Sequence, residues 1–510
     1  MYLYKYIIFL YCIFFSCFVP AQKKVTVDIL HADSFEPGTT SNLTKFLGNV
    51  RIKHNRMFMD CDSLYRYSDS SFIKAFGHVH AVQDDTLHLW GDFLVYDTEK
   101  EFAMVRNNVV LKDNRITLKT NFLDYDVGRE IGNYYNGGVI KDETNTLRSR
   151  VGYYYKEAEL LFFKDSVDVV TPDYHMVSDT MKYHTFTKII SILGPTTVYG
   201  KERTLYSEDG WYSTLLSHGE LYKNNRISYN QYICRADTIV VDSLSGTAFL
   251  KKNIVLRDTI DRMVTRGHIG EVLKWRNYAY VTDSALLIIG GERDSLYIHG
   301  DTLAVTKDTM GLDVVRAFYN TKFYSIDLQG KCDSMSFYTG DSIVRMYESP
   351  IVWTEDNQMT AEKISMKLRR NEVDNFFLED NAMLVNRRDS NMYNQIKGKK
   401  MTGYFDKNQL HMIFVDGSGE TLYYPDERGE IIGLNRASSP KIRINIEENK
   451  IASLTFIGKT EGSLKPIFMI DPQERELRGF AWHVSLRPRS VADIFKKEKN
   501  GEGEKSRSFK

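Results

Sequence analysis

The residues with the clearest capacity for chemistry in this chain are acidic side chains that recur along it, among them Asp62, Asp92 and Asp179. Paired carboxylates transfer protons in glycoside-cleaving enzymes. A catalytic pair, however, needs one part of the chain to differ from the rest, with clustered acids and bases, and no part does. Asp also accepts backbone N–H bonds at bends. We therefore interpret these acids as turn residues and expect no catalytic residue.

Two other sequence features could bind a metal ion or a phosphate, but neither defines such a site. His78 and His80 share one face of a predicted strand, with His88 nearby, but surface alternation explains them as well as a metal site does. Gly458-Lys459-Thr460 has the end of a phosphate-binding loop, but Ser453 stands where the first Gly is required. The sequence has neither HExxH nor GxSxG. We expect that the protein is not an enzyme and that it binds neither a metal nor a cofactor.

The recurring acids belong to a repeat in which an acidic or amide residue is followed by apolar residues two and four places later, as in Asp92-Phe93-Leu94-Val95-Tyr96. The first copy carries Arg66 in the fourth place. Copies lie about 30 residues apart or about twice that, and weaker copies at 150–154, 209–211 and 268–272 fill the doubled intervals. The clear copies begin at Asp62, Asp92, Asn121, Asp179, Asp237, Asp301, Asp333 and Glu362.

A second landmark precedes each copy and is rich in Gly and Asn. These residues tolerate positive φ, so we predict a turn there and a new strand at the next apolar residue. The clear forms are Gly48-Asn49-Val50, Gly77-His78-Val79, Asn107-Asn108-Val109 and Gly137-Gly138-Val139, and the weaker forms are Lys252-Asn253-Ile254 and Ser349-Pro350-Ile351.

Between these landmarks the residues alternate as in strands. Val50, Ile52 and His54 alternate with Arg51 and Lys53. There is no long amphipathic helix, and the best helical candidate is a short one near residues 491–497. A unit of a few short strands cannot bury its apolar face alone. We therefore predict an all-β fold, an elongated repeat β-solenoid of stacked units.

Residues 1–21 have the organisation of a secretory signal peptide. A lysine precedes an apolar run over residues 6–18, and Ala21 ends a segment that fits the small-residue cleavage rule. We expect cleavage after Ala21, with acylation at Cys17 as the alternative. No other stretch reaches 18 apolar residues, so we expect the mature chain to be soluble and outside the cytoplasm.

Composition excludes other classes of protein. The 510 residues carry 67 Lys+Arg and 67 Asp+Glu, without the basic excess of a nucleic-acid binder. Hydrophobic residues make up 42%, as in a folded protein. Cys61, Cys234 and Cys332 follow the signal peptide, and their odd number and spacing predict neither a disulfide framework nor a zinc site.

A signal peptide followed by Gly-Asn-Val turns and Asp-x-Leu-x-Tyr strands resembles the OstA family, the periplasmic lipopolysaccharide-transport proteins of the LptA type and the soluble part of the LptD type. The likeness is clearest from Phe46 to Tyr125 and extends more weakly to about residue 410. It implies an open, V-shaped antiparallel β-jellyroll that holds lipopolysaccharide acyl chains and pairs its end strands with other transport proteins. The chain is longer than the short LptA-type protein that builds the bridge, and after its repeats it lacks the length for the large outer-membrane barrel of the LptD type. It therefore looks like an extended member of the family, of the kind seen in Bacteroidetes.

The residues themselves also suit a lipid carrier. Each buried CH₂ of an acyl chain gains about 0.8 kcal/mol, and Tyr suits a rim where its hydroxyl meets water or a headgroup. The alternative is that the same residues fill a closed core. We expect a partner strand to pair with the edge at Val25, Val27 and Ile29. The candidate lipid-binding residues are Leu64, Leu94, Tyr96, Leu123, Tyr125, Met181, Tyr183, Ile239, Leu303 and Met335.

The predicted organisation is a signal peptide at 1–21, repeated units at 22–410, diverged end units or a cap at 411–489, and a disordered charged tail at 490–510. The predicted function is to bind lipopolysaccharide or lipid A in the periplasm and carry it to the outer membrane. Two alternatives stay open: a closed structural or adhesive β-solenoid, and a carbohydrate-active β-helix enzyme.

Overall fold

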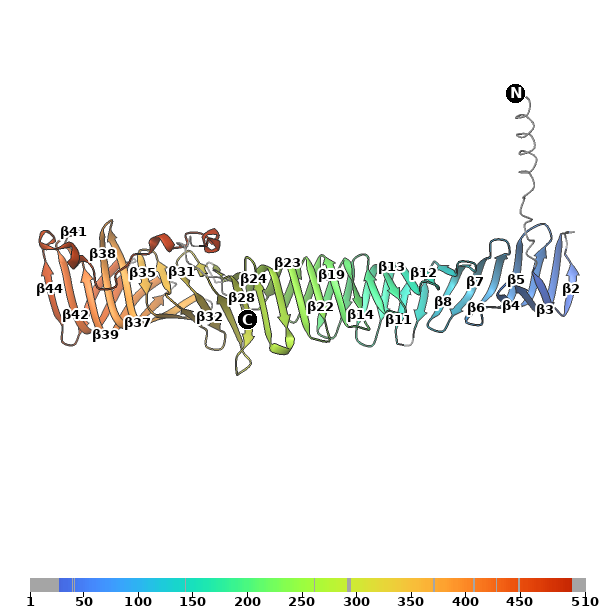
Figure 1. The fold of residues 1–510 in the computed structure, drawn as a ribbon, viewed down its shortest axis with the longest axis horizontal. Helices are drawn as coiled ribbons and strands as arrows, with labels where there is room; N and C mark the ends of the chain where they lie inside the picture. Colours follow the sequence, from blue (N-terminus) through green and yellow to red (C-terminus); the bar gives the residue numbers. More distant parts are fainter. Residues whose placement is uncertain are drawn as a thin grey trace, which may run out of the picture. The chain divides into compact units, whose positions relative to one another are not determined.

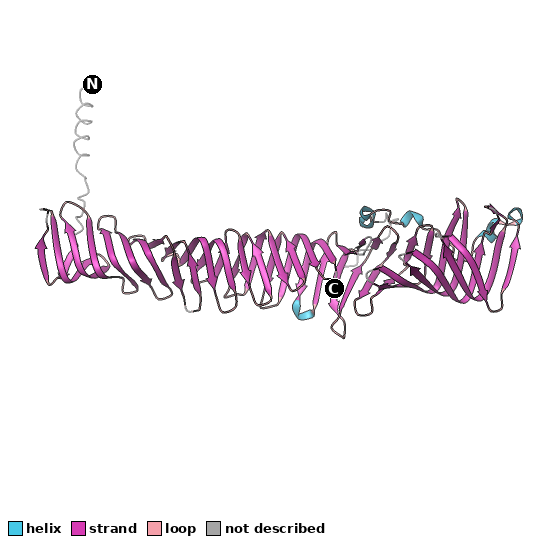
Figure 2. Cartoon of the chain, turned by 180° about the vertical axis from the view of Figure 1, so that it is seen from behind, coloured by secondary structure: helices cyan, strands magenta, loops and turns pink. Residues whose placement is uncertain are grey.

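The computed structural model describes residues 27–497, apart from 39, 41, 143, 261, 291–294, 370–371, 407–408, 428 and 448–449. In these residues nearly every element is a β-strand, and the helices are short 3-10 turns (Figure 1, Figure 2). The predicted all-β, antiparallel repeat fold is therefore confirmed. The predicted signal peptide lies outside the described residues. No helix in the described part is long and apolar enough to cross a membrane.

The chain divides into two compact units, Met1–Val198 and Tyr199–Lys510. The strands of the N-terminal unit are β1 (Asp28–His31), β2 (Ser34–Pro37), β3 (Leu43–His54), β4 (Met57–Tyr67), β5 (Phe72–Gln83), β6 (Leu87–Asp97), β7 (Phe102–Lys112), β8 (Thr117–Asp126), β9 (Ile131–Tyr134), β10 (Gly138–Lys141), β11 (Thr146–Ser149), β12 (Val151–Tyr155), β13 (Leu160–Val170), β14 (His175–His184), β15 (Ile189–Ile192) and β16 (Thr196–Tyr199).

The C-terminal unit continues the hairpin pattern beyond residue 410 and adds short helices. Its strands up to residue 347 are β17 (Arg203–Ser207), β18 (Asp209–Ser213), β19 (His218–Lys223), β20 (Asn225–Tyr229), β21 (Tyr232–Ala236), β22 (Thr238–Asp242), β23 (Thr247–Asp258), β24 (Met263–Leu273), β25 (Tyr278–Thr282), β26 (Leu286–Gly290), β27 (Ser295–His299), β28 (Thr302–Lys307), β29 (Asp313–Phe318), β30 (Thr321–Tyr324), β31 (Gln329–Cys332), β32 (Ser334–Tyr338) and β33 (Ile343–Tyr347). The remaining elements are β34 (Ile351–Thr354), β35 (Asn357–Thr360), β36 (Lys363–Arg369), β37 (Glu372–Asp389), β38 (Met392–Asp406), β39 (Gln409–Tyr423), β40 (Asp426–Glu427), β41 (Glu430–Ile431), β42 (Leu434–Glu447), β43 (Lys450–Ile457) and β44 (Glu461–Lys465), with helices η1 (Lys274–Arg276), η2 (Ile467–Met469), η3 (Pro472–Arg475), η4 (Val484–Leu486) and η5 (Val491–Phe495).

The long strands turn a corner at two consecutive residues with positive φ. In β3 these are Gly48 at +75° and Asn49 at +44°, and in β7 they are Asn107 at +61° and Asn108 at +52°. The strand pairing shifts register at both places, as at a β-bulge. Gly and Asn adopt this conformation at the least cost, so the predicted turns are confirmed. The strand, however, continues through the corner instead of beginning after it.

The same paired corner recurs along both units. Its first residue is confined by the acidic residue of the repeat, because a Cβ at Gly48 would lie 2.3 Å from the carboxylate oxygen of Asp33, and one at Gly77 would lie 2.2 Å from that of Asp62. Further corners with two positive φ values are Asp165–Ser166, Lys252–Asn253, Asp283–Ser284, Tyr319–Asn320, Glu348–Ser349, Asp380–Asn381 and Gly417–Ser418.

The repeat acid ties one corner to another. Where the second corner residue is Asn, its side-chain amide donates to the carboxylate of the acid, as it does to Asp33, which lies 29 residues before Asp62. Asp62 binds the ring of His78 instead, and Asp179 and Asp333 accept from the hydroxyls of Thr180 and Ser334. The backbone N–H of the acid donates to a corner carbonyl, as Asp237 N–H does to Lys252 at 3.0 Å. We predicted backbone N–H donors to these side chains. Asn121 accepts one, from Asn108 at 3.4 Å, whereas the carboxylates of the four pairs named next accept a side-chain amide, because the left-handed corner turns the Asn side chain toward the acid. The pairs are Asp33–Asn49 at 2.9 Å, Asp92–Asn108 at 2.7 Å, Asp237–Asn253 at 2.8 Å and Asp301–Asn320 at 2.9 Å.

Each corner divides its strand between two walls, which bury their inward side chains against each other in one apolar cluster of the N-terminal unit. In that unit wall A comprises residues 50–61, 79–91, 109–120, 138–141, 146–149 and 167–178, and wall B comprises 63–76, 93–106, 122–134, 151–164 and 180–192. In the C-terminal unit wall A comprises β20, β21, β26, β27, β30, β31, β34 and β35 with residues 254–258, 263–267, 382–389, 392–397, 419–423 and 434–438. Wall B of this unit comprises β18, β19, β22, β25, β28, β29, β32, β33 and β36 with residues 247–251, 269–273, 372–379, 400–406, 409–416 and 441–447.

Residues 466–497 return along wall A of the C-terminal unit, and we call this segment the C-terminal strap (Figure 1). Buried glutamines of wall A bind its backbone. Gln358 donates to the carbonyl of Ala481 and accepts from the N–H of His483, both at 2.7 Å, and Gln395 binds the strap in the same way. Because Gln358 alternates with the inward Met359, the strap covers the outer face of this wall.

The end of the strap differs in part from the predicted tail. The short helix expected near 491–497 is confirmed as η5. Disorder from Ser490 is wrong for residues 490–497, because Ile494 is 1% exposed and the ring of Phe495 lies 4.6 Å from that of His299. Residues 498–510 lie outside the described part.

The corners give the first testable prediction. Asn108→Val places a β-branched side chain at positive φ and removes the amide bound to Asp92, so we expect local opening to become easier by about 1–2 kcal/mol. Hydrogen exchange of the amides in 102–126 measures this opening. Asn108→Gly is the control, since it keeps the backbone conformation; protection that is equal in the Val variant and the native chain would contradict the prediction.

Candidate functional site

The predicted inward residues form one ladder of cross-strand neighbours on wall B. In the N-terminal unit Leu64, Leu94 and Leu123 follow one another, with Ala75 and Val105 between them. The three leucines are at most 1% exposed. The ladder then passes through Tyr134, Gly152 and Phe163 to Met181.

The C-terminal unit repeats this ladder with different residues. Ile239, Leu303 and Met335 are buried, at 0%, 3% and 5% exposure. In the N-terminal unit, the ladder explains why the weak copy at 150–154 has a glycine two places after its first residue. A Cβ at Gly152 would lie 2.3 Å from the ring of Tyr134, its neighbour in the ladder. A large neighbour thus replaces the missing side chain. The intermediate members are Leu250, Gly270, Val281 and Ala317.

The fourth place of the repeat is a tyrosine throughout the N-terminal unit after the first copy, and its hydroxyl reaches from wall B to the end of wall A. The Tyr96 hydroxyl lies 2.8 Å from Nδ1 of His54, and the Tyr125 hydroxyl donates to Oε1 of Gln83 at 3.2 Å. We call the series of such bridges the tyrosine seam. Its further pairs are Tyr154–Asp113 and Tyr183–Asp142.

The seam differs from what the sequence predicts for these tyrosines. Tyr96 and Tyr125 are 0% and 2% exposed, so their hydroxyls meet protein and not water. Burial and then nearby carboxylates raise the pKa of both hydroxyls, which therefore stay protonated. Burial lowers the pKa of His54, so a neutral imidazole faces Tyr96. The first two bridges of the seam are thus hydrogen bonds between neutral groups, whereas Tyr154 and Tyr183 bond the carboxyl groups of Asp113 and Asp142.

Part of the C-terminal unit has no such seam. The fourth place carries Val241, Val272 and Val305, which cannot form a hydroxyl bridge. Val305 is 37% exposed, and the other two are partly exposed. On wall A the inward Ile227 and Leu256 are partly exposed as well. We call the inner faces over residues 203–318 the open stretch, because these inward side chains keep contact with solvent although neighbouring ladder residues such as Ile239 are buried.

The predicted edge is described only in part. Val25 lies outside the described residues, Val27 is 8% exposed, and Ile29 in β1 pairs with Ile52 of β3. Strand β2 also pairs with β3 and is exposed along its length. Figure 1 shows β2 as the outermost strand of its unit.

The side chains considered for chemistry lie outside the interior or are bound. The rings of His80 and His88 stack 5.4 Å apart beside Trp90, while His78 binds Asp62 at 2.8 Å. Among the described residues, no group of three or more His, Cys, Asp or Glu is placed to hold a metal ion.

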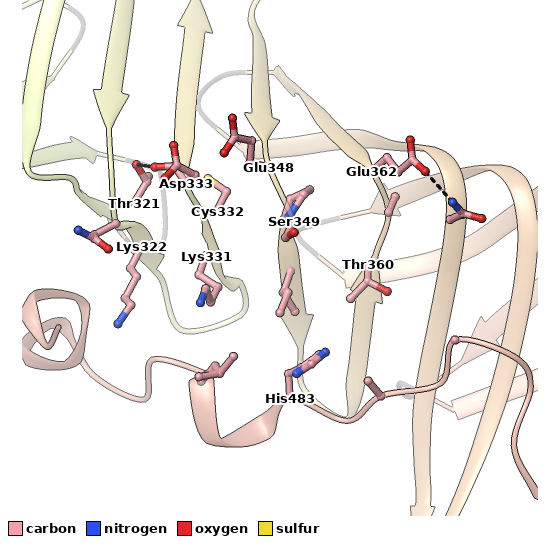
Figure 3. A pocket seen from close by; sticks show the side chains of 18 residues that line it. Thr321, Lys322, Lys331, Cys332, Asp333, Glu348, Ser349, Thr360, Glu362 and His483 are labelled. Atoms are coloured by element: carbon pink, nitrogen blue, oxygen red, sulfur yellow. Dashed lines mark hydrogen bonds between the residues drawn. The ribbon is translucent and has the colours of Figure 1, made fainter. Parts of the chain in front are cut away.

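A pocket that the sequence analysis missed lies between the C-terminal strap and wall A. Its volume is about 620 Å³. Figure 3 shows Lys322, Lys331 and His483 on the side of the strap, opposite carboxylates at the corners. The Lys322 ammonium donates to the carbonyl of Lys496 at 2.6 Å, so this charge helps to hold the strap. No short motif marks the pocket, because its two sides come from distant parts of the chain.

The fold and the interior define an all-β protein in which hairpins, each bent at a corner, stack around an apolar core. Residues 22–179 match the family model described as OstA-like protein, so this part of the chain is OstA-like and the predicted resemblance is confirmed there. Among solved structures, the chain is similar to LptH of Pseudomonas aeruginosa, described as the LptA-homologous periplasmic component of the lipopolysaccharide transport device. Identity is 16% and the TM-score 0.19, over 23% of this chain and 82% of that one. No curated protein matches the chain.

The buried thiols give a second prediction, which tests how tightly the interior packs. Burial raises the pKa of Cys61 and Cys332 to about 12. Cys234 is partly exposed beside Ile227 and Leu256 of the open stretch, so the test uses the Cys234→Ser variant. For this variant of the chain beginning at residue 22, we expect Ellman's reagent to react at least about 100-fold more slowly before unfolding in urea than after it. A rapidly reacting thiol in the folded chain would contradict this packing.

Proposed function

We propose that the chain binds lipopolysaccharide by its acyl chains and carries it across the periplasm toward the outer membrane. The observation that carries this proposal is the open stretch, where apolar inward side chains such as Val272 and Val305 remain in contact with solvent inside a repeat protein with an OstA-like N-terminal part. An acyl chain that covers these side chains gains about 0.8 kcal/mol for each buried CH₂. Because the same lining recurs, no single site has to hold the lipid tightly.

The proposal includes no catalysis. The repeat acids are bound at the corners, as Asp92 is to Asn108 at 2.7 Å. The hydroxyls of the seam are neutral. Neither set offers a proton donor and acceptor that differ from the rest of the repeat, which speaks against a carbohydrate-cleaving enzyme.

We further propose that the chain is secreted through residues 1–21 and joins other transport proteins by strand pairing at its ends. The supporting observation at the N-terminal end is β2, which pairs with β3 and is exposed along its length. An exposed end strand of this kind is a template for another strand.

The second candidate function is a closed structural solenoid. The complete burial of Leu64, Leu94 and Leu123 favours it for the N-terminal unit. The two functions differ in what they predict for the open stretch: a lipid carrier fills it with acyl chains, whereas a structural solenoid leaves it in contact with water.

Binding of labelled lipopolysaccharide to the purified chain tests the proposal. Val241→Asp puts a carboxylate on the inner face of the open stretch, where an acyl chain would have to desolvate it. We expect affinity to fall at least about tenfold, equivalent to about 1.4 kcal/mol.

Val240→Asp is the matched control, because it adds the same charge to the opposite face of the same strand. Its affinity should match that of the native chain. No binding by the folded native chain, or equal binding by the two variants, would contradict the proposed function.

A further inference from the structure

We propose that the tyrosine seam seals the interior of the N-terminal unit, so that the acyl chains of a bound lipid occupy the open stretch and reach Leu94 only when the hydroxyl bridges break. This inference rests on the proposed function and adds a barrier to the entry of acyl chains into the N-terminal unit. The seam would thus keep lipid out of the interior of the N-terminal unit, while the inner faces of the open stretch stay available to it.

The position of the bridges carries this proposal. Each tyrosine follows the ladder position by two places on wall B, as Tyr96 follows Leu94. Its hydroxyl meets the last residue of a wall A strand, as at His54, or the residue directly after one, as at Asp113. The bridges therefore join the two walls at the edge opposite the corners. The ring of Tyr96 is 0% exposed and lies between the Leu94 ladder and this edge.

The bridges form a continuous series with its own support. Gln83 accepts from Tyr125 and also donates to Glu130 at 3.1 Å, and Glu130 accepts from Lys156 at 3.2 Å. Tyr154 and Asp113 make the next bridge. Gln83 and its partner Glu130 therefore hold the Tyr125 bridge with more than one bond, so this bridge opens less readily than an isolated hydrogen bond.

The seam can nevertheless open. A hydrogen bond inside the protein is exchanged for bonds to water when the walls part, so each bridge adds little net stability. The gain from burying an acyl chain grows with every methylene. Lipid advancing along the walls could therefore part the bridges one after another. In the open stretch the row Val241, Val272 and Val305 carries no hydroxyl, so these places present no such barrier. Tyr212 begins the same row, and its hydroxyl lies 3.5 Å from that of Ser243, just after β22 of wall B.

The test uses the full chain secreted into the periplasm of cells that make lipopolysaccharide. A photo-crosslinking amino acid replaces Leu94 in one variant and Val272 in another, each in the native background and with Tyr96→Phe, Tyr125→Phe and Tyr154→Phe together. Phe keeps the ring and removes the hydroxyl. Tyr134→Phe is the matched control, since the Tyr134 hydroxyl binds Ser149 at 2.6 Å beside a corner and not at the seam.

In the native background we expect a strong lipopolysaccharide adduct at position 272 and at most a tenth of that yield at position 94. The three Phe substitutions should raise the yield at 94 at least fivefold and leave 272 unchanged, and Tyr134→Phe should raise neither. Equal yields at 94 and 272 in the native background overturn the seam and leave the proposed function standing. So does an unchanged low yield at 94 in the folded triple variant.

An absence of adduct at both positions in the folded chain overturns the proposed function and this inference with it. If the triple variant does not fold, Tyr96→Phe alone takes its place, because it removes the bridge nearest to Leu94. A rise of at least twofold at position 94 is then expected, and no rise overturns the seam.

Discussion

Two consecutive residues with positive φ are the constraint on which this structure depends. An ordinary strand cannot turn sharply, because side chains crowd the backbone in the left-handed region. Pairs such as Gly48–Asn49 and Asn107–Asn108 accept that conformation, and a carboxylate one strand away binds the amide of the second residue. Each corner sends the two halves of a hairpin into different walls. Its recurrence, every 29 or 30 residues in the N-terminal unit and at 29 to 37 residues from Lys252–Asn253 onward, aligns the inward side chains of successive hairpins.

Once the corners fix the walls, a single place in the repeat decides how the interior behaves. A Leu or Ile two places after the acid is buried in both units, so this place supplies the common core. Four places after the acid the units differ: Tyr96 bonds across to His54, whereas Val305 is 37% exposed. The same backbone thus buries a tyrosine that bonds across the walls in one unit and leaves a valine in contact with solvent in part of the other.

Local patterns predict much of this fold, and long-range contacts account for what they miss. The repeat spacing, the corners and the inward ladder could be predicted because φ preference and period-two alternation act within a few residues. The tyrosine bridges could not, since Tyr96 and His54 are 42 residues apart. The C-terminal strap is an extreme case: Gln358 binds His483 from 125 residues away, and the charged composition of the tail conceals the buried Ile494.

The central claim is that acyl chains occupy the space between the walls. The most direct measurement is mass spectrometry of the lipids carried by the folded chain when it is isolated, without detergent, from the periplasm of lipopolysaccharide-producing cells. We expect the folded chain to carry acylated lipid A or lipopolysaccharide in a stoichiometric amount. A folded chain that carries no acylated lipid, both as isolated and after incubation with lipopolysaccharide, would contradict it.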